Sequence, residues 1–154
     1  MPGTIFPIQK KESIRAKLRR AAFNLFPAYR RSGGRLCYLS DDWREVHVRL
    51  SLNWKTRNYL GTVFGGSIYG AVDPVYMMQL INILGKEYVV WDKSALIRFI
   101  KPVRRTDYAR FVITEEMLET IRHEVRLHQK CIMDFPLSFQ DESGTVYDEF
   151  VKTL

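Results

Sequence analysis

Cysteine is scarce in this sequence, and no long apolar run is free of polar residues. The two cysteines, Cys37 and Cys131, lie far apart among 154 residues and belong to no CxxC pair. This usage excludes a disulfide framework and is typical of a reduced, cytoplasmic protein. The most apolar stretch, residues 66–84, is interrupted by Asp73, Pro74 and other polar residues, which argues against a membrane-spanning helix. We expect a buried helix there instead.

Repeats, low-complexity tracts and linkers are missing as well. Residues 1–7 show no charged region followed by an apolar run, so we expect no signal peptide. A chain of 154 residues is long enough to bury a sizeable core as one unit. We therefore expect a single domain over residues 1–154, located in the cytoplasm.

Acidic residues are nearly absent from the first part of the chain, and this accounts for the net charge of +7. Residues 1–35 hold nine Lys or Arg and one acid, whereas the remainder holds fifteen bases and sixteen acids. Residues 10–31 have the period of a basic amphipathic helix, with an apolar stripe that includes Ile14, Leu18 and Leu25. We expect this stripe to pack on the domain and the arginines to lie in solvent. Binding to an anionic membrane is the alternative, and nucleic acid fits less well because the aromatic residues lie near the stripe.

Hydrophobic periodicity predicts an α+β fold. Alternating residues predict strands over 35–40, 46–52, 88–91, 95–101, 108–114, 131–139 and 145–151, and a 3.6-residue period predicts helices over 12–31, 65–84 and 115–123. This order suggests an antiparallel sheet wrapped around the long central helix, with the N-terminal helix as an addition. Because that central helix is apolar on nearly every side, the sheet covers only part of it, and we expect a second subunit to cover the rest.

Two features of the central segment carry chemistry. Gly65 and Gly66 open the helix, where the first backbone N–H groups have no intrahelical acceptor and can bind an anion or polarise a carbonyl oxygen. Asp73 interrupts the apolar helix directly before Pro74, and a core carboxylate needs a reason because its burial is costly. Each feature also has a plain structural interpretation, the glycines as a tightly packed loop and Asp73 as a hydrogen-bonded carboxylate at a kink.

Helix geometry separates these two features within one chain. Asp73 follows Gly65 by eight positions, about 12 Å along a helix axis. One chain therefore cannot aim both groups at one carbonyl. Two such helices packed antiparallel about a two-fold axis can do so, with Gly65 of one copy facing Asp73 of the other. The pattern favours a homodimer with two shared sites.

This segment resembles the helix-start motif of hotdog-fold thioesterases of the PaaI-like type, in which Asn, Gly, His-Gly-Gly and a later Asp follow in order. The matching residues are Asn58, Gly61, Gly65, Gly66 and Asp73, and the run Ser94–Val103 resembles the family strand that ends in Phe-x-x-Pro. Phe64–Ser67, Asp73-Pro74 and Val90–Lys93 are still closer to a branch described as tetrameric acyl-CoA thioesterase-like. The resemblance covers about Leu25 to Leu154 and implies a hotdog fold and a homotetramer.

The resemblance also implies hydrolysis of an acyl thioester. In that interpretation, the amides of Gly65 and Gly66 hold the oxyanion, and Asp73 of the partner copy acts as general base or as nucleophile. Asn58 would orient the water or the carboxylate, and Ser67 in the first helical turn would assist or be an ordinary first-turn residue. No metal and no cofactor is implied, because coenzyme A enters only as part of the substrate.

One position departs from the family pattern, since Phe64 stands where the family has a His before the glycine pair. Phe64 would line the substrate site without offering a hydrogen bond. Lys101, Arg104 and Arg105 are the expected partners of the coenzyme A phosphates, unless they form only a solvated basic turn. A non-catalytic protein that binds acyl groups or acyl-CoA is the alternative function. A dehydratase acting on hydroxyacyl thioesters ranks last, because that class usually pairs Asp with a His near the motif.

Overall fold

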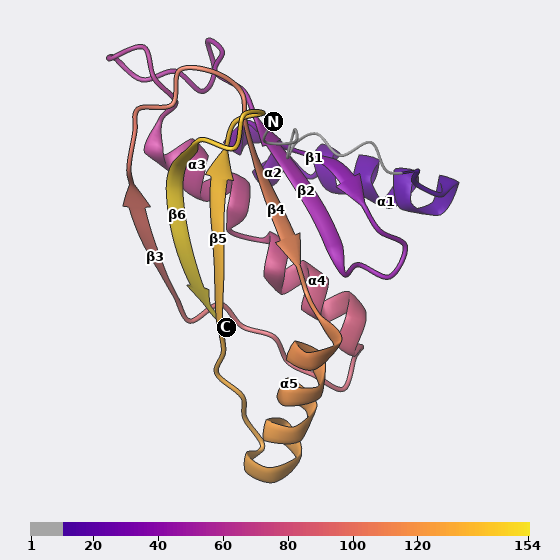
Figure 1. Cartoon of the computed structure of the whole chain (residues 1–154). Coiled ribbons are helices and arrows are strands. Elements are labelled where there is room, and N and C mark those ends of the chain that lie inside the picture. Colours follow the sequence, from indigo (N-terminus) through magenta and orange to yellow (C-terminus); the bar gives the residue numbers. More distant parts are fainter. Residues whose placement is uncertain (1–10) are drawn as a thin grey trace.

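The computed structural model describes residues 11–154, which form one six-stranded antiparallel sheet and five helices (Figure 1). The strands lie in the order β1-β2-β4-β5-β6-β3. They are β1 (Gly34–Leu39), β2 (Glu45–Leu50), β3 (Ser94–Phe99), β4 (Asp107–Val112), β5 (Asp134–Gln140) and β6 (Val146–Thr153). The helices are α1 (Ile14–Leu25), α2 (Pro27–Ser32), α3 (Gly65–Val72), α4 (Val75–Leu84) and α5 (Glu115–His128). Residue 10, the predicted start of the N-terminal helix, lies outside the described residues. So do residues 1–7, where we expect no signal peptide.

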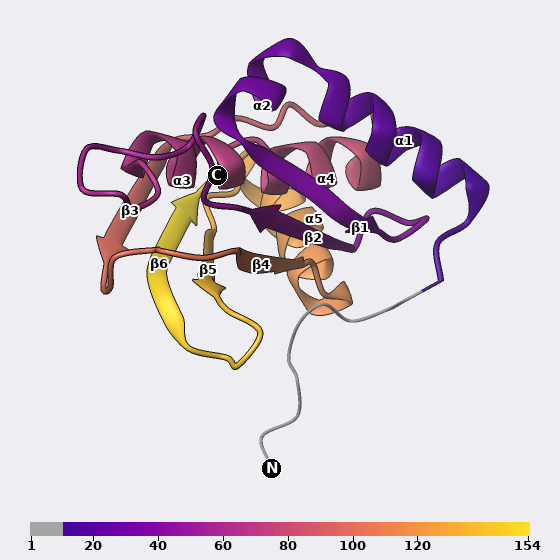
Figure 2. The same ribbon diagram turned by 90° about the horizontal axis from the view of Figure 1, so that it is seen from above.

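The sheet curves around α3 and α4, which confirms the predicted wrapping (Figure 2). Ile68, Ala71, Val72 and Val75 of these helices are buried with the inner side chains of the strands in one core. The predicted single central helix is interrupted between α3 and α4, because the ring of Pro74 cannot donate the amide hydrogen that a continuous helix needs. Within residues 11–154, no helix is both long and apolar enough to cross a membrane.

The N-terminal helix differs from its prediction in two ways. It breaks at Phe26, since the residue before a proline disfavours the helical conformation. Along α1 the stripe expected to pack on the domain is exposed instead, with Ile14 at 79% and Leu18 at 67% exposure, whereas its last member, Tyr29 of α2, is buried as expected. The opposite face of α1 meets strand β1 at the edge of the sheet, where Asn24 bonds both backbone groups of Leu36 at 2.8 and 2.9 Å. Unpaired backbone groups of an edge strand need such partners. The face of α1 that contains Asn24 therefore meets β1, and the apolar stripe faces outward.

Two segments predicted as strands are not strands. Residues 88–91 run without a strand partner, because β3 begins to pair with β6 only at Ser94, opposite Thr153. Residues 131–133 likewise precede β5, whose pairing with β6 begins at Asp134. Helix α5 extends to His128, beyond the predicted end at residue 123. Together these differences leave residues 87–93 and 129–133 as two neighbouring loops beside α4 and α5 (Figure 1).

Candidate functional site

The N-terminus of α3 has no side-chain cap, and its N-cap residue is Phe64. The Phe64 carbonyl accepts hydrogen bonds from the amides of Ser67 and Ile68, at 2.9 and 3.1 Å. Gly65 and Gly66 occupy the two positions before these, where helix amides have no intrahelical acceptor. The free amides and the helix dipole together make this end of α3 electropositive.

Two aromatic rings lie against the glycine positions. A Cβ at Gly66 would collide with the ring of Phe64, and a Cβ at Gly65 would come 3.3 Å from the ring of Phe99 on β3. Phe64 and Phe99 are themselves 57% and 58% exposed. The α3 N-terminus is therefore an open position with aromatic walls, close to the edge of the sheet formed by β3.

The loop before α3 is held in place by Asn58. Its Oδ1 accepts the amides of Leu60 and Thr62 at 2.9 and 3.1 Å, and its Nδ2 donates to Thr62 Oγ1 at 2.8 Å. The amide of Phe64 then donates to the Thr56 carbonyl at 2.7 Å, which sets the direction of α3. The structure thus engages Asn58 within the loop. Ser67, the other predicted assistant, is buried in the first turn of α3.

Asp73 lies at the other end of α3, and its environment differs from the predicted buried carboxylate. Its side chain is 42% exposed, whereas the buried charge beside it is Lys152 of β6, whose side chain is 1% exposed. The Lys152 Nζ lies 2.8 Å from Asp73 Oδ1 and 3.0 Å from Asp92 Oδ1. A hydrogen bond to Asp73 raises the pKa of the Tyr69 hydroxyl, with burial as the second cause. The site therefore contains a Lys between two carboxylates.

Lys152 is a site residue that our sequence interpretation missed. Burial favours the neutral amine, but hydrogen bonds to Asp73 and Asp92 outweigh that effect and raise the pKa of Lys152. A signal was present in the sequence, because Asp148, Phe150 and Lys152 alternate along β6 and all three are buried. A charged residue in phase with an inward Phe predicts a buried ion pair on that face.

A second missed feature is a pair of buried acids. Asp107 of β4 and Asp148 of β6 are each 1% exposed, and none of their four carboxyl oxygens has a hydrogen-bond partner in residues 11–154. Burial raises the pKa of Asp148 to about 7. Burial is the largest cause that raises the pKa of Asp107 to about 7, and the negative charges of Asp148 and Asp141 add to it. Asp148 pairs in register with Phe99, the residue whose ring lies beside Gly65.

The predicted phosphate-binding cations lie on the loop between β3 and β4. This loop is tied to the α3 entry by the hydrogen bond from the Val63 amide to the Val103 carbonyl, at 2.9 Å. Arg104 Nη1 lies 3.5 Å from the Leu60 carbonyl, and Arg105 Nη1 lies 3.5 Å from Asp141 Oδ2. The structure brings Lys101, Arg104 and Arg105 to the same end of the molecule as Gly65, while Asp73 lies one helix length away. Part of their hydrogen-bonding capacity is already used within the protein.

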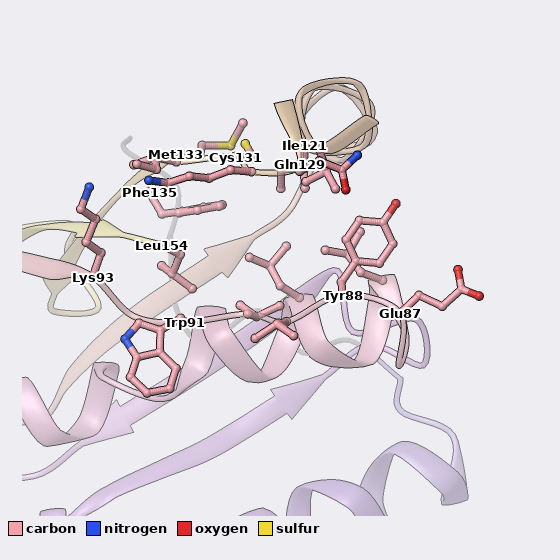
Figure 3. Close-up of a pocket in the computed structure, with 17 residues that line it drawn as sticks. Glu87, Tyr88, Trp91, Lys93, Ile121, Gln129, Cys131, Met133, Phe135 and Leu154 are labelled. Atoms are coloured by element: carbon pink, nitrogen blue, oxygen red, sulfur yellow. The ribbon is translucent and has the colours of Figure 1, made fainter. Parts of the chain in front are cut away.

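An apolar cavity of about 470 Å³ opens between α4, α5 and the two loops that follow them (Figure 3). Trp91 and Lys93 lie at one end and Tyr88 at the other, with Cys131 and Met133 across from them (Figure 3). Asp92, between Trp91 and Lys93, is the residue that pairs with Lys152. The cavity therefore begins one residue away from the ion-pair network that holds Asp73. Across residues 11–154, no group of three His, Cys, Asp or Glu side chains is arranged to hold a metal ion.

The family model described as "Domain of unknown function (DUF4442)" matches residues 15–154, and the chain belongs to this family. No curated protein matches the sequence. A protein of unknown function from Pseudomonas aeruginosa, PA5026, is similar in structure, with a TM-score of 0.76 and 20% identity over 89% of this chain and 91% of that one.

Two further structures extend this similarity. Thioesterase superfamily member 2 from Mus musculus has a TM-score of 0.65 and 14% identity, over 92% of this chain and 96% of that one. The phenylacetic acid degradation protein PaaI from Thermus thermophilus has a TM-score of 0.57 and 15% identity, over 82% and 96%. At these identities the similarity establishes the fold. The chain has the hotdog fold, as its sequence predicted.

Proposed function

We propose that the protein is a thioester hydrolase that acts on acyl-CoA as a homodimer with two shared sites. The observation that carries this proposal is α3 itself, with open amides at Gly65 and a Lys-supported carboxylate at Asp73. These ends stand about 12 Å apart along one helix, and an antiparallel partner helix brings opposite ends together. Structural similarity to thioesterase superfamily member 2 and to PaaI supports the same reaction class.

The surface of β3 supports a second copy as the partner. Strand β3 is an edge of the sheet, and its side chains Leu96 and Phe99, with the adjacent Ile100, are exposed. An exposed apolar edge strand favours pairing with another chain. Pairing two β3 strands would cover Phe99 and bring the aromatic walls of Gly65 into the interface. A tetramer would then be a dimer of such dimers.

The proposed reaction begins with the thioester carbonyl oxygen at the amides of Gly65 and Gly66. Asp73 of the other copy takes a proton from water as the water oxygen attacks the carbonyl carbon, and the amides stabilise the oxyanion. The oxyanion collapses, the carbon–sulfur bond breaks, and the proton passes from Asp73 to the leaving thiolate. The Lys152 Nζ, 2.8 Å from Asp73 Oδ1, holds this carboxylate in place. Direct attack by Asp73 through an acyl-enzyme anhydride is the alternative route.

The cavity beside α5 provides a place for the acyl chain. Its lining is mostly apolar, and its volume of about 470 Å³ lies within the usual range for ligand pockets. It opens next to Asp92, which shares Lys152 with Asp73. The copy that supplies the base would therefore also hold the acyl chain.

The experiment is thiol release from acyl-CoA substrates of graded chain length, with wild type, Asp73→Asn and Asp92→Asn. Both substitutions remove one carboxylate from Lys152, so they disturb the ion pair alike. Asp73→Asn should lower kcat by about 100-fold or more, the usual contribution of a general base, while Asp92→Asn should stay within about tenfold. Equal activity of wild type and Asp73→Asn would refute the mechanism.

A non-catalytic acyl-CoA-binding protein is the second candidate. The observation in its favour is Phe64, which cannot donate a hydrogen bond where related enzymes have a His. Tight binding of acyl-CoA by the folded dimer without any thiol release would establish this function instead. Turnover that depends on Asp73 would exclude it.

A further inference from the structure

A basic groove of about 810 Å³ lies between α2, the ends of β1 and β2, and the start of the loop that leads to α3. Its cations are Arg30, Arg31, Arg35, Arg49 and Lys55. Among the described residues, no Asp or Glu lines this groove, and no ion pair joins any of these five cations to a carboxylate. Positive charge is thus concentrated on a concave surface without an internal counter-ion.

The arrangement of two of these arginines is unfavourable without an anion. Arg35 and Arg49 lie directly opposite each other in the β1–β2 register. Like charges in such cross-strand pairs are destabilising. The Arg35 guanidinium lies 3.4 and 3.5 Å from two backbone carbonyls, which satisfies donors but leaves the charge in place. A bound polyanion would neutralise both arginines at once.

An aromatic ring beside the cations indicates the class of anion. Trp54 lines the groove, is 81% exposed, and has Lys55 Nζ 5.1 Å from its ring centroid. An exposed indole next to arginines suits a planar base joined to phosphates, because stacking and charge-assisted hydrogen bonds then act on one ligand. A nucleotide with more than one phosphate has this chemistry, whereas a simple inorganic anion does not use the ring.

The groove is connected to the α3 N-terminus through Thr56. On one side, the Thr56 methyl lies so close to Gly33 of the groove that a Cβ there would collide with it. On the other side, the Thr56 carbonyl accepts the amide of Phe64, the N-cap of α3. The loop that contains Thr56 therefore connects the groove to Phe64, the residue directly before Gly65.

We propose that this groove binds the phosphorylated nucleotide end of a coenzyme A thioester, with its reactive carbonyl at Gly65 of the same copy. This inference rests on the proposed function and assigns a different part of each site to each of the two copies. One copy binds the nucleotide and supplies the oxyanion amides. Its partner supplies Asp73 and the cavity for the acyl chain. A single substrate molecule thus spans both copies.

The first test is direct binding of adenosine 3′,5′-bisphosphate to the full-length protein carrying Asp73→Asn, so that hydrolysis plays no part. Adding Arg35→Gln and Arg49→Gln should raise Kd by about tenfold or more, since both substitutions remove a charge-assisted hydrogen bond to a phosphate. Arg15→Gln, an exposed α1 cation outside the groove, should leave Kd within about twofold. Circular dichroism and thermal melting establish that each variant is folded.

Several results would overturn the groove assignment. One is an unchanged Kd in the Arg35→Gln/Arg49→Gln protein, and another is equal binding of adenosine without phosphates. Tight binding of a single-stranded RNA that the bisphosphate does not displace would make the groove a nucleic-acid surface instead. Nucleotide binding without any thioester hydrolysis would support the groove assignment and refute the proposed reaction. Hydrolysis of acyl-CoA with KM unaffected by the two arginine substitutions would support the reaction and refute the groove assignment.

The second test is complementation between two proteins that are each impaired at low substrate concentration. Asp73→Asn lacks the base, and Arg35→Gln/Arg49→Gln lacks the nucleotide site. In a mixed dimer, one site combines an intact groove with an intact Asp73 from the other copy. Co-expression should therefore restore about one quarter of wild-type activity at low substrate concentration, because half of randomly formed dimers are mixed and each has one complete site. Failure to restore activity in verified mixed dimers would show that one copy supplies both ends.

Discussion

The buried acids Asp107 and Asp148 should make the protein less stable as the pH rises. Each carboxyl has a native pKa of about 7 against an ordinary value of 3.8. Between these values the folded chain binds more protons than the unfolded chain, so the free energy of unfolding decreases with rising pH. Below about pH 4 and above about pH 7 this contribution is constant. The direction is opposite to that of a carboxylate stabilised by a salt bridge.

The size of the effect follows from the two pKa values. For one carboxyl, the change from 3.8 to about 7 corresponds to about 4 kcal/mol lost between acid and alkaline pH. A domain of this size is stabilised by about 5–15 kcal/mol, so the loss is a large fraction of the total. Asp141 and Arg105 are the other charged groups that act on Asp107, and they stay in place when Asp148 is changed.

The assay is urea unfolding of wild type and Asp148→Asn at several pH values between about 4 and 8. The amide cannot ionise, so the variant should gain about 3–4 kcal/mol relative to wild type on going from the acid to the alkaline end. Any cost of burying the amide is the same at every pH and cancels in this comparison. Asp134→Asn, an exposed carboxylate bonded to Thr153, is the matched control and should parallel wild type. Parallel curves for wild type and Asp148→Asn would refute the reasoning.

Three further predictions concern the ion pair, the core and the cavity. Lys152→Met should lower the free energy of unfolding by only about 1 kcal/mol in urea titrations, because the two carboxylates it leaves without their cation are 42% and 26% exposed and water solvates them. Gly34→Ala should cost about 1–3 kcal/mol, measured by thermal melting, because its Cβ would lie 2.7 Å from the Ala71 Cβ. Cys131→Trp fills the cavity beside α5 and should shift the preferred acyl-CoA substrate to shorter chains. Leu127→Trp, an exposed position of α5 outside the cavity lining, should leave the chain-length profile unchanged.

The sheet, the central helix and the α3 entry were predictable because each depends on local pattern. The alternation of apolar and polar residues predicted which side chains of β2 and β4 face the core. Gly65 and Gly66 predicted the start of α3. The break before α4 follows from the covalent structure of Pro74. Where the residues themselves decide the conformation, the sequence was sufficient.

The errors arose where a distant part of the chain decides the outcome. The exposed stripe on α1 depends on β1 being an edge that needs Asn24 as a hydrogen-bond partner. The exposure of Asp73 depends on Lys152, which lies 79 positions later in the chain. Of this ion pair, the Lys152 side chain is the buried member and the Asp73 side chain is partly exposed. Neither pairing leaves a periodic signal near the residue concerned. An inward charge on a strand, such as Lys152, is the sequence feature that deserves a search for a partner.

Phe64 changes what the α3 N-terminus must do chemically. In the proposed dimeric site, which has no His, the polar groups within reach of a bound carbonyl would be the backbone amides of Gly65 and Gly66 and the Asp73 carboxylate of the second copy. These act weakly in water and more strongly in a low-dielectric site. In the single chain the walls formed by Phe64 and Phe99 are more than half exposed, so the amides face solvent. Pairing of β3 with a second copy would cover Phe99 and dry the site, and dimer formation would then be a condition for catalysis as well as a source of Asp73.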